Sequence, residues 1–302
     1  MTKHVAVLLG GLSAEREVSL TGGKAAVQVL EERGYQVSAI DVSRELCQQL
    51  ALAKPDVVYN ALHGPLGEDG TVQGMLEILG IPYSHSGVLA SALAMDKAMA
   101  KTMFTAAGIR CPESVMTTID LIDRGDHMTL PYVVKPNREG SSVGVTIVRD
   151  ETDRPNIRNH WPYGDEVMVE RYIEGRELTV SVLGDRPLGV TEISPKQGFY
   201  DYHAKYTDGV ADHLLPAPVA PATYQRAMDD ALAAHQALGC RGVSRADFRL
   251  SEDDPDGLYL LEVNTQPGMT PLSLVPEQAA HVGIDFGDLV TQLVEEARCD
   301  AA

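Results

Sequence analysis

An arginine, two carboxylates and an amide stand at strand spacing in two segments toward the end of the sequence. The first segment reads Arg245-Ala-Asp247, and the second ends in Glu262-Val-Asn264. Residues two apart in a strand share a face, so both polar side chains of each segment point the same way. If the strands pair, the oxygen donors and the guanidinium converge, as a Mg²⁺ ion beside phosphate requires. A surface ladder of cross-strand charge pairs is the alternative interpretation.

A lysine followed by small residues forms a second chemically capable segment, VKPNREGSSVG, which contains Lys135. Gly140, Ser141, Ser142 and Gly144 offer backbone N–H groups and hydroxyls with little side-chain bulk. Such a loop can cradle phosphate, with the lysine as a fixed cation. It is not a Walker A loop, because GxxxxGK[ST] is absent and no helix is expected to follow. An ordinary polar hairpin with an exposed lysine remains the alternative.

Two polar, glycine-containing segments follow predicted strands near the start of the chain: GGLSAEREVS at 10–19 and HGPLGEDG at 63–70. The first lacks the GxGxxG spacing of dinucleotide folds, so we interpret Asp41 as a turn residue and not as a ribose ligand. Glu15 stands at a helix start, where the helix dipole alone favours acidic residues. His63 fits either a structural histidine that bonds loop backbone or a functional residue at a strand end.

The elements that position these segments fall into two parts. In the first part, short apolar strands at Val5–Leu9, Val37–Ile40 and Asp56–Ala61 alternate with helices such as Ser19–Arg33. This pattern predicts a parallel sheet with helices on both faces and ligands at the carboxyl ends of its strands.

The second part begins after a predicted helix at Met95–Ala107 and is richer in strands. A long stretch at Pro195–Pro221 is rich in Pro, Gly, Tyr and Asp, as functional lids often are. The predicted strands are Glu113–Met116, Tyr132–Lys135, Val143–Val148, Val167–Arg171, Glu177–Leu183, Pro187–Ser194, Ser244–Leu250 and Leu258–Val263. The predicted later helices are Ala222–Leu238, Pro276–Val282 and Phe286–Arg298.

Composition excludes several classes of partner. The 302 residues predict about two domains. Asp and Glu number 43 against 25 Lys and Arg, a net charge of −18, which argues against nucleic acid and against anionic membranes as partners. No apolar run could span a bilayer, and the apolar start is too short for a signal peptide, so we expect a cytoplasmic protein. The separated cysteines Cys47, Cys111, Cys240 and Cys299 predict free thiols.

The ordered set of motifs resembles the D-alanine–D-alanine ligase family of the ATP-grasp superfamily from about Val5 to Val294. The motifs are LLGGLSAEREVS, HGPLGEDG, MDK, VKPNREGSSVG, YHAKY, RADF and LLEVNTQPGMTPLSLVP. The resemblance implies an α/β and α+β chain, with an N-terminal Rossmann-like domain (1–94) before a two-subdomain ATP-grasp fold. The implied subdomains are a central one (95–174) and a C-terminal one (175–302) that carries the lid and the metal site.

The resemblance also implies a reaction. ATP phosphorylates the carboxylate of one D-alanine, and the amine of a second attacks the acyl phosphate to give a dipeptide for peptidoglycan synthesis. The implied cofactors and partners are ATP, D-alanine, two Mg²⁺ or Mn²⁺ ions bridged by Glu262, and a second copy in a homodimer.

Site roles follow from matching positions. Glu15 and His63 would hold the first D-alanine, Glu15, Ser141 and Tyr206 would lock the lid, and Arg245 with the Gly268 N–H would stabilise the oxyanion. Ser273 and Leu274 would hold the second substrate, and the implied metal ligands are Asp247, Glu262 and Asn264. The implied ATP ligands are Lys97, Lys135, Ser142, Glu170, Arg171, Tyr172, Ile173, Glu177 and Lys205, with 170–173 reading adenine and Glu177 the ribose.

Two residues depart from the family pattern: Gln266 replaces a frequent serine, and Pro271 follows Thr270. Neither position carries a catalytic role in the resemblance, and Tyr206 speaks against a D-lactate-adding relative. Three rival interpretations stay open at this level. They are another ATP-grasp carboxylate–amine ligase, a nucleotide-binding protein without chemistry, and a dinucleotide-dependent oxidoreductase.

Overall fold

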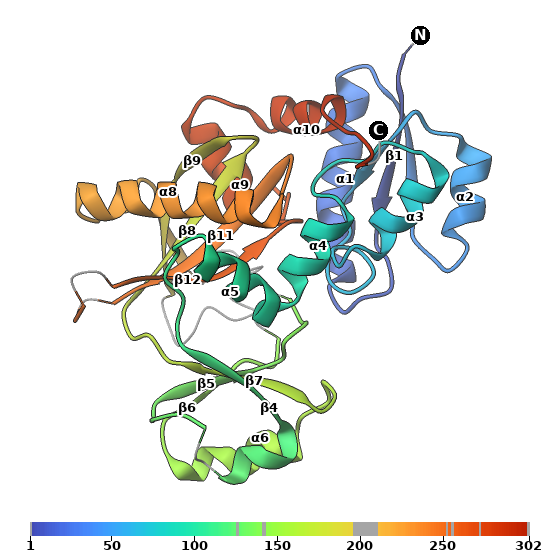
Figure 1. The fold of residues 1–302 in the computed structure, drawn as a ribbon. Helices are drawn as coiled ribbons and strands as arrows, with labels where there is room; N and C mark the ends of the chain where they lie inside the picture. Colours follow the sequence, from blue (N-terminus) through green and yellow to red (C-terminus); the bar gives the residue numbers. More distant parts are fainter. Residues whose placement is uncertain are drawn as a thin grey trace.

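The computed structural model describes residues 2–124, 127–140, 143–195, 211–251, 253–254, 257–271 and 273–300. These residues form sheets of three, four and five strands with helices packed on their faces (Figure 1). The mixed helix-and-sheet architecture agrees with the predicted fold class.

The first sheet is parallel, as predicted, with the order β2-β1-β3. Its strands are β1 (His4–Leu9), β2 (Gln36–Asp41) and β3 (Val57–Asn60). Alternate residues of β1 enter different cores: Val5 and Val7 pack toward α1 (Arg16–Glu32), and Ala6 and Leu8 pack toward α2 (Leu46–Ala53) and α3 (Thr71–Leu79). Burial on both faces explains why β1 is an uninterrupted apolar run.

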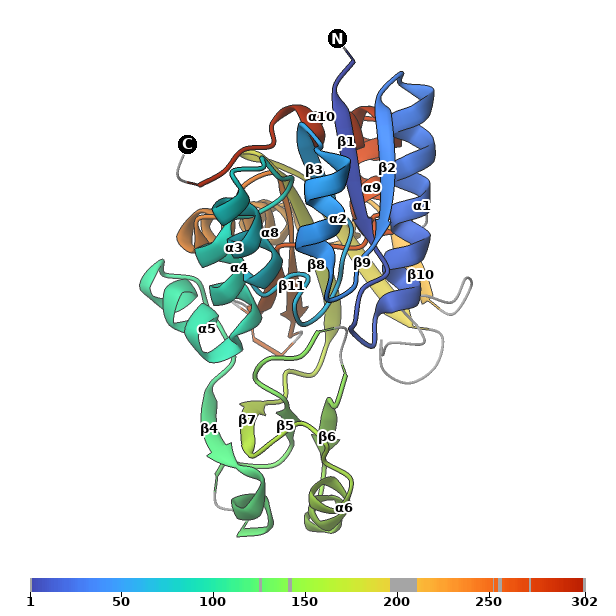
Figure 2. The same cartoon turned by 90° about the vertical axis from the view of Figure 1, so that its right-hand side faces the viewer.

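The C-terminal helix α10 (Phe286–Glu295) packs on this first sheet, far from its place in the sequence. Its buried Leu289 and Leu293 join the core that contains Val5 and Val7. Figure 2 shows α10 beside β1 and β3. The Asp285 carboxylate accepts from the Asp288 N–H at 2.7 Å, which caps the helix at its start. The chain therefore returns to its N-terminal part at its end.

The four-stranded sheet is antiparallel, with the order β4-β7-β5-β6. One face is covered by α6 (Arg154–Asn159) and two 3-10 turns, which bury Ile122, Val134 and Val169 between them. The strands are β4 (Ser114–Thr118), β5 (Tyr132–Lys135), β6 (Thr146–Val148) and β7 (Glu166–Arg171). The predicted strand over 143–148 is shorter than expected, because a turn occupies its first residues.

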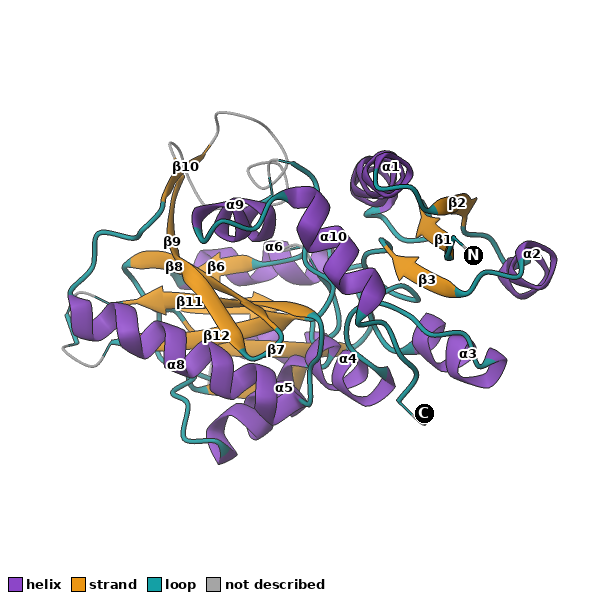
Figure 3. Cartoon of the chain, turned by 90° about the horizontal axis from the view of Figure 1, so that it is seen from above, coloured by secondary structure: helices purple, strands orange, loops and turns teal. Residues whose placement is uncertain are grey.

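The five-stranded sheet has the order β10-β9-β8-β11-β12. Its strands are β8 (Arg176–Leu183), β9 (Arg186–Pro195), β10 (Ala211–Leu214), β11 (Val243–Leu250) and β12 (Leu258–Asn264). Seen from above in Figure 3, one face is covered by α5 and α8, and the other by α9. These helices are α5 (Lys97–Ala106), α8 (Pro221–Leu238) and α9 (Leu274–His281).

Three findings bear on the remaining expectations. A separate helix α4 (Val88–Met95) precedes α5, although the sequence pattern gave no helix there. The predicted mobile stretch contains β10, while 196–210 lie outside the described residues. All four cysteines are free thiols, as predicted, and no helix within the described ranges is long and apolar enough to cross a membrane.

Candidate active site

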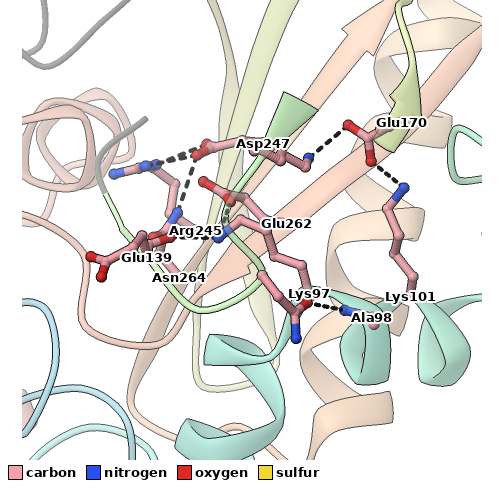
Figure 4. A network of polar contacts seen from close by, with 11 residues as sticks. Lys97, Ala98, Lys101, Glu139, Glu170, Arg245, Asp247, Glu262 and Asn264 are labelled. Atoms are coloured by element: carbon pink, nitrogen blue, oxygen red, sulfur yellow. Dashed lines mark hydrogen bonds and ion pairs between the residues drawn. The ribbon is translucent and has the colours of Figure 1, made fainter. Parts of the chain in front are cut away.

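Strands β11 and β12 pair as the period-2 pattern predicted. Arg245 stands opposite Asn264, and Asp247 opposite Glu262, in an antiparallel register that shifts directly after Asp247. The four side chains therefore meet on neighbouring strands (Figure 4). The surface-ladder alternative is wrong for Asp247, because its side chain is buried.

Hydrogen bonds hold the Asp247 carboxylate from several sides. Arg245 donates through Nε to Oδ1 at 2.8 Å and through Nη2 to Oδ2 at 2.7 Å. The Thr179 hydroxyl donates to Oδ1 at 2.7 Å, and the Asn264 amide to Oδ2 at 3.1 Å. A buried carboxylate with this many donors is fixed in place before any ligand arrives.

The donor set fits a hard cation. Two carboxylates and one amide oxygen, from Asp247, Glu262 and Asn264, are ligands that Mg²⁺ accepts together with phosphate oxygens. The described part of the chain contains no group of three His, Cys, Asp or Glu residues arranged for a metal, so the amide and the substrate would have to complete the coordination. Glu262 is partly exposed and free to reorient toward an incoming ion.

A capped helix start delivers Lys97 to the same place. The Asp96 side chain accepts from the Met99 N–H and so caps α5. Lys97 Nζ donates to the Glu139 carbonyl oxygen at 2.5 Å and lies 3.6 Å from Glu262 Oε2. The lysine thus links the loop after β5 to the predicted metal ligands.

A pocket opens beside these groups, between the four- and five-stranded sheets. The residues that line it are Lys97, Val133, Lys135, Pro136, Glu139, Val143, Val145, Glu170, Arg171, Tyr172, Ile173, Arg249, Leu261 and Glu262.

Glu170 is the buried anion of this pocket. Lys135 Nζ donates to its Oε1 at 2.6 Å, and Lys101 forms a close ion pair with its Oε2. All three side chains are less than 8% exposed. Burial opposes ionisation of Glu170, but the charges of the two lysines outweigh it and hold the pKa of the carboxyl below its usual range. Lys135, expected at phosphate, is paired here with a carboxylate.

The end of β7 and the residues after it line the pocket with Arg171, Tyr172 and Ile173. The Arg171 side chain donates to the Tyr259 hydroxyl at 2.9 Å. The Ile173 carbonyl oxygen accepts from Arg249 Nε at 3.2 Å. Glu177, the expected ribose ligand, lies 3.6 Å from Arg249 Nη1 and is not among the lining residues, so Arg249 stands between it and the pocket.

A second acidic corner lies at the ends of β1 and β3. The Ser13 hydroxyl donates to the His63 carbonyl oxygen at 2.7 Å and accepts from the Glu15 N–H at 3.2 Å, which joins the two predicted segments. A Cβ at Gly140 would meet Glu15 Oε2 and Glu68 Oε1, each at 3.1 Å, so both carboxylates face this glycine. Burial and the charge of Glu15 raise the pKa of Glu68 to about 8.

His63 is buried between this corner and Arg245. Burial is the main reason that its pKa falls to about 4, and the nearby positive charge of Arg245 lowers it further. The ring is hydrogen-bonded to the backbone of Gln266. His63 is therefore neutral at physiological pH, with one nitrogen engaged by the protein.

Gln266, noted only as a departure from the family pattern, has a structural role. It is 3% exposed, and its amide donates to the Asn60 carbonyl oxygen and lies 3.3 Å from His85 Nδ1. It ties the end of β12 to the end of β3. A serine is too short to span the same gap, so the departure is a matter of packing between the two sheets.

The last predicted substrate residues lie at the start of α9. Ser273 caps the preceding loop: its Oγ accepts from the Thr270 N–H at 3.0 Å. A Cβ at Gly268 would lie 3.0 Å from the same oxygen, so a side chain there would crowd Ser273. Leu274 is buried against Ile193. Ser141, Ser142, Lys205 and Tyr206 lie outside the described residues.

Sequence reasoning erred on Asp41 and missed several residues. Asp41 is the last residue of β2, not a turn residue, and accepts two hydrogen bonds from Arg16, at 2.7 and 2.5 Å. Lys101 was detectable as the residue one helical turn after Lys97. The other missed residues are Glu68, which stands inside the HGPLGEDG motif, and Arg249, two residues after Asp247.

Family profiles match most of the chain. Residues 107–295 match D-ala D-ala ligase C-terminus, and residues 47–86 match D-ala D-ala ligase N-terminus. A protein of Sinorhizobium fredii named D-alanine--D-alanine ligase is 55% identical over 301 residues, covering 98% of each chain. One of Rhodospirillum rubrum with the same name is 56% identical over 305 residues, covering 100% of each.

Solved structures agree. The D-alanine--D-alanine ligase from Bacillus anthracis complexed with ATP has a TM-score of 0.82 and 34% identity, covering 98% of this chain and 96% of that one. A D-Ala:D-Ser ligase from Enterococcus faecalis has a TM-score of 0.82 and 30% identity, covering 98% and 99%.

Proposed function

The chain belongs to the D-alanine–D-alanine ligase family, and we propose that it joins two D-alanines with ATP, through a D-alanyl phosphate, to supply peptidoglycan synthesis. The observation that carries the proposal is the meeting of Arg245, Asp247 and Glu262 on paired strands, with Glu262 lining the pocket between the two sheets. A carboxylate is a poor acyl donor, and phosphorylation supplies the leaving group.

ATP occupies the pocket between the two sheets in this proposal. The base lies against Glu170 and the backbone of Tyr172 and Ile173, and Glu177 with Arg249 faces the ribose end. Lys97 and Lys135 contact the phosphates. Both lysines are buried. Lys97 is held by the Glu139 carbonyl oxygen and loses little conformational entropy on binding, whereas Lys135 would exchange its bond to Glu170 for one to a phosphate. The roles of Ser142 and Lys205 follow from the resemblance alone.

The first D-alanine binds with its ammonium at the acidic corner. Glu15 supplies the counter-charge, and Glu68 adds a second carboxylate that a cation would ionise. Neutral His63 is beside them and can accept or donate one further hydrogen bond. The substrate carboxylate then points toward the metal ligands and the γ-phosphate, where its oxygen attacks phosphorus and ADP leaves.

Arg245 and the N–H of Gly268 stabilise the oxyanion of the second step. The amine of the second D-alanine attacks the acyl carbon, the carbonyl oxygen gains negative charge, and inorganic phosphate leaves as the amine loses a proton. Arg245 is held in position by its two hydrogen bonds to Asp247, so it does not have to reorient when the charge develops. Ser273 and Leu274 lie at the start of α9, where they hold the second substrate.

Asp247, Glu262 and Asn264 would hold the two divalent ions that the family resemblance implies. Bound Mg²⁺ or Mn²⁺ would neutralise the phosphate oxygens. The same proposal includes a lid contact of Glu15 with Ser141 and Tyr206. It also includes a homodimeric assembly, a cytoplasmic location and domain boundaries near residues 94 and 174.

Phosphate release from ATP and Mg²⁺ tests the reaction. We expect D-alanine to stimulate release and D-alanyl-D-alanine to appear by mass, with L-alanine inert. D-Alanine supplied together with D-serine or D-lactate tests the specificity of the second substrate site. Mixed products would favour another ligase of the ATP-grasp superfamily. No release with any of these, while ATP binds, would support a nucleotide-binding protein without chemistry.

A further inference from the structure

Lys101 is a buried charge for which the reaction gives no use. Its side chain is 7% exposed, its Nζ donates to the Pro112 carbonyl oxygen at 2.8 Å, and it forms a close ion pair with Glu170. It is absent from the residues that line the nucleotide pocket, whereas Glu170 lines it. Lys101 therefore stands behind Glu170 and can act on a ligand only through that carboxylate (Figure 4).

One cation would be enough to neutralise Glu170, yet two contact it. Lys135 binds one oxygen from β5, and Lys101 approaches the other from α5. Lys135 lines the pocket, so it can move toward a phosphate when nucleotide binds. A buried carboxylate that loses its only cation is strongly destabilised. With Lys101 in place, Glu170 keeps a counter-ion after Lys135 turns away.

An ionised carboxylate accepts hydrogen bonds and cannot donate them. Placed at the base, it attracts an exocyclic amino group and repels a carbonyl oxygen. We propose that Lys101 is a positioning residue that keeps Glu170 charged and directed into the pocket, and thereby selects a 6-amino purine over a 6-oxo purine. This inference rests on the proposed function, because it takes the pocket as the nucleotide site.

The groups that face Glu170 support this assignment. They are Lys135 from β5, Lys101 from α5 and the thiol of Cys111 before β4, whose pKa burial raises to about 11, so that it stays neutral. Burial lowers the pKa of Lys101, and the charge of Glu170 opposes that shift. Removing Lys101 leaves burial opposed by a single lysine, so the pKa of Glu170 rises.

Equilibrium binding of ADP and IDP, which differ at position 6 of the base and in whether N1 accepts or donates a hydrogen bond, tests the proposal without requiring ligation. Wild-type protein should bind ADP more tightly than IDP at every pH from 6 to 9. In Lys101→Met the ADP/IDP affinity ratio should fall about tenfold or more, the loss expected for one hydrogen bond to a charged group. ADP affinity of this variant should also weaken as pH falls, because protonated Glu170 attracts the exocyclic amino group less.

Four further variants decide whether Lys101 acts through Glu170. Lys101→Arg, which keeps the charge, should keep most of the selectivity. Phe104→Leu perturbs the same buried face of α5 without touching Glu170 and should leave the ratio unchanged. Glu170→Gln should lower the ratio alone, and adding Lys101→Met should lower it no further. The double variant removes one anion and one cation together and so keeps the net charge of the wild-type cluster, and its comparison with Glu170→Gln still tests the proposal if Lys101→Met does not fold.

An unchanged ADP/IDP ratio in folded Lys101→Met, or additive losses in the double variant, would overturn the proposal. If wild-type protein binds neither nucleotide, the pocket assignment itself fails. If it binds both with the expected preference but makes no dipeptide, the proposed reaction fails while the role of Lys101 stands.

Discussion

The two acidic places of this molecule are built in opposite ways. At the base end of the nucleotide pocket, one carboxylate, Glu170, is paired with Lys101 and Lys135. At the ends of β1 and β3, two carboxylates, Glu15 and Glu68, face Gly140. The first place carries an excess of one positive charge and the second an excess of negative charge.

This difference shows in the pKa of each group. Burial raises a carboxyl pKa in both places, but the two lysines reverse the effect for Glu170, while Glu15 adds to it for Glu68. The carboxylate of the first place already has its counter-ions and needs no ligand to neutralise it. A site with two facing carboxylates gains most when a cation arrives, and the ammonium of D-alanine is such a cation.

Removal of Glu15 should have the largest effect on activity. Glu15→Gln removes the carboxylate that supplies the main counter-charge to the substrate ammonium in the proposed complex. We expect kcat/KM for D-alanine to fall at least about a hundredfold, the usual loss for a buried charge partner. The KM for ATP should stay within a few-fold, and the melting temperature should not fall. A normal kcat/KM would remove Glu15 from the substrate site.

Stability should respond in opposite directions at the two places. Glu170→Ala leaves two buried lysines without their carboxylate partner and should lower the free energy of unfolding by about 3–5 kcal/mol. Glu68→Gln removes like-charge repulsion and should leave stability equal or higher. Denaturant unfolding of the two variants, side by side with wild type, measures both. Equal losses of unfolding free energy in Glu170→Ala and Glu68→Gln would show that the charges inferred for the two places are wrong.

The pH dependence of stability should reveal the raised pKa of Glu68. Its folded pKa, about 8, is above its ordinary value of 4.5, so the folded protein binds the extra proton more tightly. The resulting stabilisation is present below pH 4.5 and is lost as pH rises toward 8. Relative to Glu68→Gln, substrate-free wild type should therefore become less stable across this range. Parallel curves for the two proteins would contradict the assignment.

An exposed pair gives the smallest expected effect and completes the comparison. Arg16 and Asp41 are bonded as closely as the buried groups, but their side chains are 40% and 52% exposed. Water and salt screen such pairs. Arg16→Ala should leave the midpoint of unfolding almost unchanged, and a large loss would mean that pairing, not burial, sets these energies.

Local pattern was enough to predict the pairing of β11 with β12. A period of two places Asp247 and Glu262 on known faces, and the structure brings them opposite each other. The parallel order of β1, β2 and β3 followed from short apolar strands that alternate with helices. The family resemblance supplied the roles of single residues, which no spacing rule could assign.

Contacts between distant segments were beyond such reasoning. Glu170 meets Lys101 only because β7 packs near α5, and periodicity does not state which elements become neighbours. The packing of α10 on β3 could not be predicted for the same reason. Leu293 is apolar whichever element the helix packs against, so its residue type does not identify the partner. Asp41 was misassigned because spacing along the sequence does not show that its side chain meets Arg16 in the fold.

The central claim is that the ammonium of D-alanine is the charge that the Glu15–Glu68 corner needs. Calorimetric titration of D-alanine in two buffers of different ionisation enthalpy, with a non-hydrolysable ATP analogue present, measures it directly. Below pH 8, where Glu68 is protonated in the substrate-free protein, D-alanine binding should release about one proton per protein molecule, and Glu68→Gln should release none. Binding without proton release in the wild type would contradict the account.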